Sequence, residues 1–332
     1  MILILSQEEN ELTTELVLDW LTYNNCDVIR LNGENLLEKP FHWKLSGSNI
    51  KSSFSNPKIK VEDIKVIWYR RWTKYTQNNA ITLKNITSKT LHNLKSHLKL
   101  EFGTFSRHFF DKNKGAKWFD NPTLSHLNKL DVLALANQYG LRTPKTLVTN
   151  SKEQLSIFSE EVKRVITKPI SEVTFFDNKE GGLYTMQTKE VTENDIKHLD
   201  EMFYPSLFQE LIEKRYEIRA FYLEKTFYSM AIFSQRREES KIDFRNYSFI
   251  NPDKMVPFQL PLEIENKLEK VITTIGMTSC SVDIIKSSEN EFVFLEINPV
   301  GQFGMVSYPC NYYLEKKVAV KLKKISEDGK MD

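Results

Sequence analysis

The fold is decided by the stretch Val293-Phe294-Leu295-Glu296-Ile297-Asn298-Pro299-Val300-Gly301-Gln302-Phe303, an apolar strand that ends in a carboxylate, an amide, a proline and a glycine. Side chains two positions apart on a strand point to the same face. Glu296 and Asn298 should therefore project together, while Leu295 and Ile297 pack on the other face. The stretch predicts two oxygen donors that share one small space at the end of a strand.

The preceding segment predicts a partner for this strand. Ser281–Lys286 is a second apolar run, and the polar turn Ser287–Asn290 would fold it back as a hairpin. Asp283 would then face the same space as Glu296 and Asn298. Two carboxylates and an amide oxygen match the ligands that Mg²⁺ uses when water and phosphate oxygens complete its shell. The alternative is a hairpin whose acidic groups are merely solvated.

Length and charge bound the class of protein. A chain of 332 residues predicts two or three domains with a sizeable core. Its 46 basic and 44 acidic residues give a net charge of +2, which argues against a general nucleic-acid binder. The sequence contains no window of the roughly 20 apolar residues that cross a membrane. Local patches must therefore account for any anion binding.

Cysteines and the N-terminus indicate the compartment. Cys26, Cys280 and Cys310 are odd in number and far apart, which argues against a disulfide framework or a Cys-x-x-Cys metal site and favours a reducing cytoplasm. The apolar start Met1–Ser6 is short and is followed at once by Gln7-Glu8-Glu9, so it predicts a buried strand and not a signal peptide. The six histidines show no metal-binding spacing.

The first third of the chain predicts a small α/β domain. A strand at 2–5, a helix at about 11–23 and a strand at 27–31 form a parallel strand-helix-strand unit. The apolar strand Val66–Trp72 delivers Arg70 and Arg71 at its end, where arginines suit carboxylate or phosphate binding, or simply pair with surface acids.

A long helix follows at about 88–110. Its apolar stripe, predicted to pack in the core, comprises Leu91, Leu94, Leu98 and Phe102.

The middle of the chain begins at a break. Asn121-Pro122 marks a domain boundary, and a helix at about 123–139 contains Lys129. A strand at 163–169 carries Lys168 near its end. A loop with Gly181-Gly182 could lay backbone amides over an anion, although a plain turn explains it as well.

The last third predicts mostly strands. A strand at 206–212 leads into charged residues at 213–219, and the turn Glu224-Lys225 joins the next two strands as a hairpin. Helices are expected at about 262–275 and 311–324.

The order of these features resembles that of the ATP-grasp ligases, and in particular the graspetide ligases (microviridin-type, including the grasp-with-spasm peptide maturases). The resemblance covers essentially the whole chain. The matching segments are Val66–Arg71, Asn128–Leu130, Ala136–Pro144, Val165–Lys168, Phe208–Ile212, Glu217–Arg219, Asp243–Arg245 and Phe294–Gly301.

The resemblance implies an α/β (α+β) ATP-grasp fold of three domains. Residues 1–120 would form an N-terminal α/β domain, 121–206 a central lid subdomain, and 207–332 a C-terminal subdomain with the metal site. The nucleotide would lie in a cleft between the central and C-terminal subdomains. The Gly181-Gly182 loop is shorter than the lid loops of some relatives, which argues against a phosphate-binding role for it.

The resemblance also implies a role for each candidate residue. Asp283, Glu296 and Asn298 would hold Mg²⁺, and Arg219 would stabilise the transferred phosphoryl group. The nucleotide would be bound by Lys129 and Lys168 at its phosphates, by Glu210, Leu211 and Ile212 at adenine, and by Glu217 at the ribose. The peptide would be held by Arg70, Arg71, Arg236 and Arg245, with Asp243 orienting an arginine or the nucleophile.

The implied activity is ATP-dependent macrocyclisation of a ribosomally made precursor peptide. An Asp or Glu side chain would be activated as an acyl-phosphate and attacked by a Ser or Thr hydroxyl or a Lys amine. The alternative is a ligase that adds free amino acids, of the ribosomal-protein glutamylating or glutathione-synthetase type. The resemblance implies ATP and Mg²⁺ as cofactors and suggests a homodimer. The cysteines favour the cytoplasm, and the balanced charge and the lack of a long apolar window argue against nucleic-acid and membrane partners.

Overall fold

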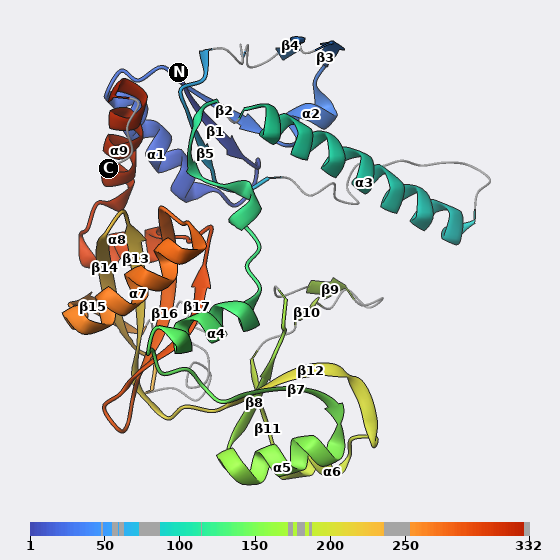
Figure 1. The fold of residues 1–332 in the computed structure, drawn as a ribbon, viewed down its shortest axis with the longest axis vertical. Helices are drawn as coiled ribbons and strands as arrows, with labels where there is room; N and C mark the ends of the chain where they lie inside the picture. The colour runs from blue at the N-terminus through green and yellow to red at the C-terminus, as the bar shows by residue number, and fades with distance from the viewer. Residues whose placement is uncertain are drawn as a thin grey trace. The chain divides into compact units, whose positions relative to one another are not determined.

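The computed structural model describes residues 1–47, 49–54, 59, 63–72, 87–113, 115–171, 175–177, 183–185, 188–235 and 253–328. The chain forms two compact units (Figure 1). The first comprises residues 1–125, 302–304 and 313–332, and the second comprises residues 126–301 and 305–312. The C-terminal helix thus folds with the N-terminal residues, and the three-domain division stays a prediction.

The first unit is built on a parallel sheet. Its strand order is β2-β1-β5-β6, with β1 (Ile2–Ser6), β2 (Val28–Asn32), β5 (Val66–Tyr69) and β6 (Lys117–Asp120). Helix α1 (Leu12–Tyr23) connects β1 to β2, which confirms the predicted strand-helix-strand unit. Every residue of β1 is buried. Helix α9 (Leu314–Asp328) packs against α1 and β5, where the sequence predicted a helix at 311–324.

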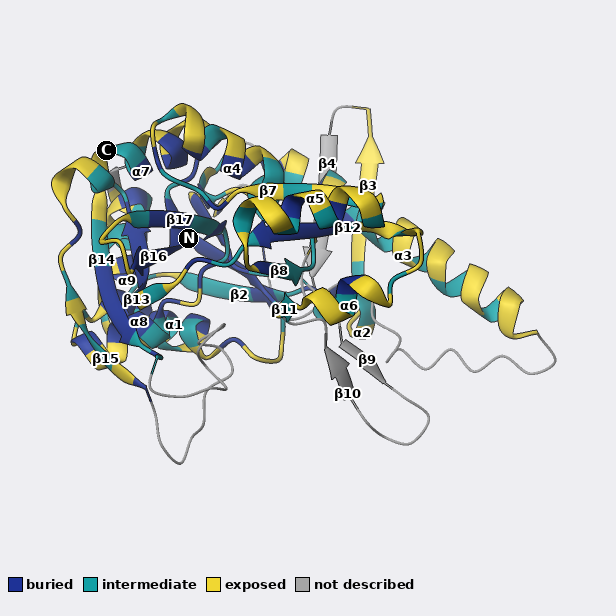
Figure 2. Ribbon diagram, turned by 90° about the horizontal axis from the view of Figure 1, so that it is seen from below, coloured by how far each residue is buried: buried dark blue, intermediate teal, exposed yellow. Residues whose placement is uncertain are grey.

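The remaining elements of the first unit include α2 (Asn35–Glu38), the hairpin of β3 (Phe41–Ser46) and β4 (Asn49–Phe54), and α3 (Ser88–Lys112). Only Ser106 and Phe109 of α3 are buried, and Trp72 donates a hydrogen bond to Ser106. The predicted stripe of Leu91, Leu94, Leu98 and Phe102 is only half-buried along its whole length, so the prediction that it packs in the core is wrong. Figure 2 shows much of α3 as exposed, and Leu100 is 66% exposed.

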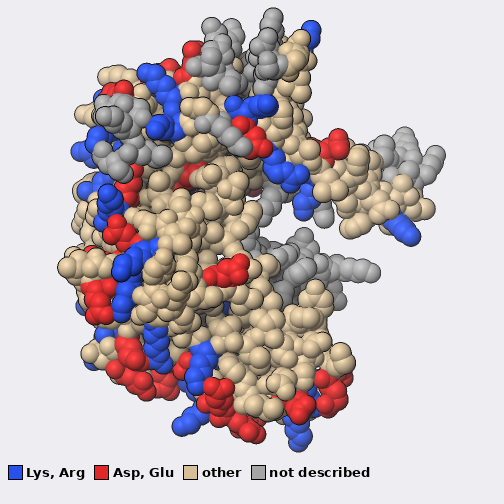
Figure 3. All heavy atoms as spheres, in the orientation of Figure 1, with Lys and Arg blue, Asp and Glu red and all other residues tan. Residues whose placement is uncertain are grey.

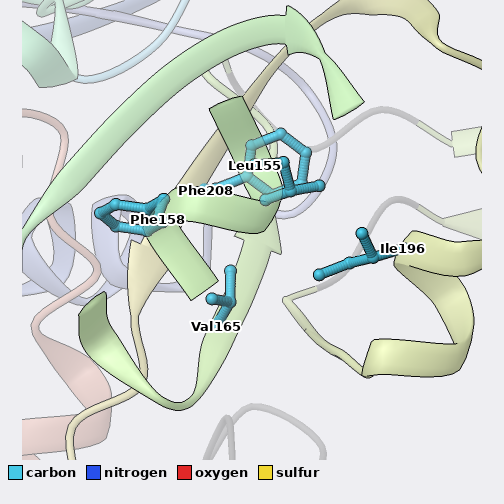
Figure 4. Close-up of a cluster of buried hydrophobic side chains, with 5 residues drawn as sticks. All are labelled: Leu155, Phe158, Val165, Ile196 and Phe208. Atoms are coloured by element: carbon cyan, nitrogen blue, oxygen red, sulfur yellow. The ribbon is translucent and has the colours of Figure 1, made fainter. Parts of the chain in front are cut away.

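The second unit contains two larger sheets. The first is antiparallel and has the order β11-β8-β12-β7, with β7 (Thr146–Ser151), β8 (Val165–Lys168), β11 (Lys189–Val191) and β12 (Met202–Glu210). Helices α5 (Lys152–Val162) and α6 (Glu193–Lys197) pack on it. Figure 4 shows their shared core, formed by Leu155, Phe158, Val165, Ile196 and Phe208. A short hairpin pairs β9 (Phe175–Asp177) with β10 (Leu183–Thr185).

The second sheet is antiparallel and positions the candidate site. Its order is β15-β14-β13-β16-β17, with β13 (Lys214–Leu223), β14 (Thr226–Phe233), β15 (Lys254–Phe258), β16 (Ser279–Ser287) and β17 (Phe292–Asn298). The Glu224-Lys225 turn is confirmed, and both residues have positive φ. Helix α7 (Leu262–Ile275) agrees with the predicted range, and the short helix α8 (Gly304–Cys310) follows β17.

Helix α4 (Lys129–Gln138) starts later than predicted. Residues Pro122–Leu124 form a separate 3-10 turn, and the side chain of Asn128 caps α4 by accepting a hydrogen bond from the Leu130 amide. Lys129 is therefore the first residue of the helix instead of lying inside it.

Among the described residues no helix is long and apolar enough to cross a bilayer. On the face that Figure 3 draws, basic and acidic side chains are scattered among a majority of other residues.

Candidate nucleotide and metal site

Three neighbouring strands bring the predicted metal ligands together. Arg219 on β13 lies opposite Asp283 on β16, and Asp283 lies opposite Glu296 on β17. Residues directly opposite each other on neighbouring strands point to the same face of the sheet. Asn298 points to the same face as Glu296, because it lies two positions further along the strand. A register shift between Asp283 and Ile284 makes Leu295 an extra residue in β17. The predicted hairpin is thus confirmed. It also contains a bulge that the sequence did not predict.

The bulge changes the surroundings of Leu295. The sequence predicted that this side chain packs on the face away from Glu296. It instead packs beside Ile285, which shares the face of Asp283, and that prediction is wrong. The cause is the inserted residue, because one extra position reverses the alternation along the strand.

The polar side chains form one hydrogen-bonded group. The Arg219 guanidinium donates to both Asp283 carboxylate oxygens, at 2.9 and 3.0 Å. The Asn298 amide donates to Asp283 Oδ2 at 2.9 Å and to Glu296 Oε1 at 3.4 Å. Asp283 and Arg219 are each only 8% exposed. The charge of Asp283 is thus balanced inside the protein by Arg219.

This group suits Mg²⁺ that keeps phosphate and water ligands better than it suits a metal ion whose ligands all come from protein side chains. Among the described residues there is no cluster of three or more His, Cys, Asp or Glu side chains that could hold a metal. The group instead offers two carboxylates and one amide, a donor set that suits an ion whose other ligands are phosphate oxygens and water. Asp283, Glu296 and Asn298 are the residues that would hold it.

Gly301 packs tightly beside this group. A Cβ added there would lie 2.2 Å from Ser281 Oγ and 2.8 Å from the Ser281 backbone nitrogen. Ser281 is opposite Asn298 in the strand register. Only glycine allows the chain leaving β17 to lie this close to β16.

Lys129 lies next to the carboxylates. Its ammonium is 4.0 Å from Glu296 Oε2 and donates to the carbonyls of Pro169 and Ser171, at 3.3 and 3.0 Å. These carbonyls directly follow β8, which ends at Lys168. The second unit therefore brings Lys129 and the end of β8 together near the predicted metal ligands.

The segment Glu210–Ile212 connects the two sheets of the second unit. The Glu210 amide donates to the Lys145 carbonyl and the Leu211 amide to the Arg164 carbonyl, both at 2.9 Å. The Ile212 amide makes no backbone hydrogen bond to any residue that the structure describes. Ile212 packs in an apolar cluster with Ile285, Val293 and Leu295. A donor beside an apolar surface can bind the edge and face of an aromatic base.

The side chain of Glu210 is also held in place. Its Oε2 accepts a hydrogen bond from the Lys145 amide at 3.2 Å, and Arg142 approaches Oε1 at 3.6 Å. Arg142 also forms an ion pair with Glu291. Sequence reasoning missed Arg142 as a site residue, although it lies in the matching segment Ala136–Pro144.

Glu217 is 7% exposed and accepts two hydrogen bonds on Oε1. One comes from Lys214 and the other, at 3.1 Å, from Ser234. Neither donor was predicted as a site residue. The sequence signal that was available is the proximity of Lys214 to Glu217 in the charged segment after β12.

The predicted peptide-binding arginines Arg70 and Arg71 belong to the first unit. The Arg70 guanidinium is fully buried and lies 5.1 Å from the Trp68 ring centre and 5.5 Å from that of Phe303. Burial lowers the pKa of Arg70, and the nearby Glu11 opposes this effect. Arg71 is 30% exposed, and its Nε lies 3.2 Å from Glu11 Oε1.

Other predicted residues lie outside the described part of the chain. They are Arg236, Asp243 and Arg245, together with the Gly181-Gly182 loop.

Comparison with known proteins decides the fold. No protein-family model matches the chain. A RiPP-associated ATP-grasp ligase from Chryseobacterium gregarium, solved with ADP and a leader and core peptide, is 25% identical with a TM-score of 0.84 over 99% of this chain and 97% of that one. The macrocyclase MdnC from Microcystis aeruginosa, solved with the precursor peptide MdnA, is 22% identical with a TM-score of 0.81 over 97% of this chain and 99% of that one. The chain has the ATP-grasp fold. The resemblance stated from the sequence is confirmed.

A curated relative also agrees with this ATP-grasp assignment. The α-aminoadipate–LysW ligase LysX from Sulfurisphaera tokodaii is 25% identical over 209 residues, which are 59% of this chain and 69% of that protein. The ligase PsnB, 16% identical with a TM-score of 0.75, was solved with a minimal precursor, Mg and ADP. The prediction of ATP as a cofactor agrees with the ADP bound in the Chryseobacterium gregarium ligase.

Proposed function

We propose that this ATP-grasp protein closes rings in a ribosomally synthesised precursor peptide. The observation that carries the proposal is the buried Arg219–Asp283–Asn298–Glu296 group, on a fold shared along its length with a ligase bound to ADP and a leader and core peptide. The group suits phosphoryl transfer, because such catalysis depends on positioning and on neutralising phosphate charge.

The peptide reaction has two steps. A carboxylate oxygen of a peptide Asp or Glu bonds to the γ-phosphorus of ATP as the bond to the β-phosphate oxygen breaks, which yields an acyl-phosphate and ADP. A Ser or Thr hydroxyl, or a Lys amine, then attacks the acyl carbon, loses its proton and displaces phosphate. The peptide loses one molecule of water for each ring that forms.

Different residues of the second unit bind different parts of the nucleotide. Bound Mg²⁺ would neutralise phosphate charge, held by Asp283, Glu296 and Asn298. Lys129 and Lys168 bind the phosphates. Support for Lys129 is its position between Glu296 and the carbonyls that follow β8.

Adenine and ribose are bound away from the metal. The Ile212 amide donates to a ring nitrogen of adenine, beside the linker residues Glu210 and Leu211, and Glu217 accepts from the ribose hydroxyls. Support comes from the Ile212 amide, which has no backbone acceptor among the described residues, and from the adjacent apolar cluster.

Arginines hold the acidic peptide. Arg219 stabilises the transferred phosphoryl group while it fixes Asp283. Arg71, which is partly exposed, binds a peptide carboxylate, and the buried Arg70 supports the strand end that presents it. Arg236, Arg245 and Asp243 are further residues that we propose act on the peptide, as the resemblance implies.

The test is incubation of the purified protein with ATP, Mg²⁺ and a candidate precursor peptide, rich in Ser or Thr and in Asp or Glu, from an open reading frame adjacent to its gene. Mass spectrometry should detect loss of one water per ring. Glu296→Gln should abolish this loss while peptide binding persists. The matched control is Glu289→Gln in the same hairpin, where the carboxylate is 78% exposed, and it should cyclise normally. Unchanged turnover by Glu296→Gln would remove Glu296 from the metal site.

The second candidate function is addition of free amino acids to a peptide or protein. The similarity to the LysW ligase favours it. A gain in mass equal to an added amino acid, in place of a loss of water, would establish this alternative.

We also propose that the protein is a cytoplasmic homodimer whose three domains are 1–120, 121–206 and 207–332. Support for the compartment is the odd number and the wide spacing of the cysteines, at positions 26, 280 and 310. Support for the dimer is the apolar stripe of α3, which is only partly buried.

A further inference from the structure

A bulge in β13 changes the direction of one lysine. Along a regular strand, Lys214 and Glu217 would point to opposite faces, since they are three positions apart. The pairing of β13 with β16 runs from Lys214↔Ser287 to Tyr216↔Lys286, so that Arg215 is an extra residue. Bulges re-aim side chains in this way. Lys214 therefore joins Glu217 and Arg219 on one face.

The contacts confirm this alignment. The Lys214 ammonium is bonded to Glu217 Oε1, and the Lys214 side chain is only 4% exposed. The Ser234 hydroxyl donates to the same oxygen at 3.1 Å. Two donors on one oxygen fix the rotation of the carboxylate. A lysine this buried also loses much hydration and side-chain freedom, so its placement requires a partner such as Glu217.

The alternative explanation is that the pair only stabilises the fold. A buried ion pair is weak evidence for stability, because desolvating both charges offsets much of their attraction. Apolar residues of similar size would serve a purely structural role as well. A fixed carboxylate next to the adenine linker serves a binding role better, since it need not reorganise when hydroxyl donors arrive.

We infer that Lys214 is a positioning residue that makes the nucleotide site selective for ribose over deoxyribose. It acts through Glu217, whose carboxylate it holds in the orientation that accepts hydrogen bonds from both ribose hydroxyls. This inference rests on the proposed nucleotide site. It adds the residue that sets sugar selectivity.

The test is calorimetric binding of Mg-ADP and Mg-2′-deoxy-ADP to the full-length protein without peptide. The wild type should bind ADP about tenfold more tightly than deoxy-ADP, as expected for one hydrogen bond to a charged acceptor. Lys214→Met keeps the side-chain length and removes the charge. It should weaken ADP binding about tenfold and leave deoxy-ADP almost unchanged, so that selectivity disappears.

Two variants guard against a folding defect. Lys214→Arg retains a donor and should recover most of the selectivity. Ser234→Ala removes the smaller donor and should reduce selectivity partially. In turnover assays with peptide, Lys214→Met should raise the KM for ATP with little change in kcat.

Three results would overturn the inference. They are an equal loss of ADP and deoxy-ADP binding in Lys214→Met, unchanged selectivity in Lys214→Met and Ser234→Ala, and a wild type without sugar selectivity. A failure of the proposed ring closure would give a different result from these three. A wild type that binds ADP selectively but modifies no peptide refutes ring closure alone.

Discussion

Arg219→Met should destabilise the second unit strongly. Arg219 donates to both oxygens of Asp283, and both residues are 8% exposed. Removing one partner of a buried ion pair leaves the other charge uncompensated, which costs about 3–5 kcal/mol. Since Asn298 still donates to Asp283, we expect the lower end, about 3 kcal/mol.

Urea unfolding can assign this loss to one unit. All five tryptophans lie in the first unit, at residues 20, 43, 68, 72 and 118. Fluorescence of tryptophan therefore follows the first unit, whereas far-UV circular dichroism follows both. Arg219→Met should shift the dichroism transition to lower urea and leave the fluorescence transition in place. Hydrogen exchange of the β13 and β16 amides should accelerate in parallel.

Two variants make the reasoning refutable. Arg164 pairs with Glu190 at 2.7 and 2.8 Å but is 44% exposed, so Arg164→Met should cost less than about 1 kcal/mol. Adding Asp283→Asn to Arg219→Met should restore most of the lost stability, because no buried charge is then left unpaired. We would reject this explanation if Arg219→Met lost no more free energy of unfolding than Arg164→Met. We would also reject it if the double variant recovered none of the lost stability.

Three further predictions concern other parts of the chain. Gly301→Ala should lower both stability and Mg-ADP affinity, because its Cβ would collide with Ser281, whereas Gly103→Ala in α3, with nothing within 4 Å, should unfold at the same or higher urea. Burial raises the pKa of the Cys310 thiol to about 11. Unfolded thiols ionise first as pH rises from 9 to 11, so the free energy of unfolding should fall over that range, and less steeply in Cys310→Ala. Leu94→Glu on the α3 stripe should halve the mass measured by light scattering, and an unchanged mass would exclude this stripe as a dimer interface.

The sequence predicts the hairpin and its ligands because the relevant signals are local. Two-residue periodicity puts Glu296 and Asn298 on one face, and the polar turn predicts the hairpin that brings Asp283 near them. The pairing of Asp283 with Glu296 depends on the extra residue Leu295. The bulges at Arg215 and Leu295 are not predictable in this way, because one inserted residue leaves the composition and the apolar pattern of a strand nearly unchanged. The error about the direction of Leu295 comes from this cause.

The prediction for α3 failed for a different reason. Helical periodicity identifies which face is apolar but not what covers it. The C-terminal half of α3 meets Trp43 and Trp72, whereas the apolar residues of the first half stay partly exposed. The burial of Arg70 likewise depends on Trp68 and on Phe303, which is far away in the sequence.

The placement of the nucleotide residues also limits where substrate choice can arise. Lys214, Glu217 and Arg219 form one row along β13, with neighbours on this face about 7 Å apart. The row runs from the adenine linker toward Asp283. Backbone pairing in the centre of a five-stranded sheet fixes this row, so the nucleotide pose that we propose would follow from strand register. Choice between peptide acceptors must then come from residues outside these strands, such as Arg71. Exchanging such residues should alter which peptides are cyclised while leaving ADP affinity unchanged.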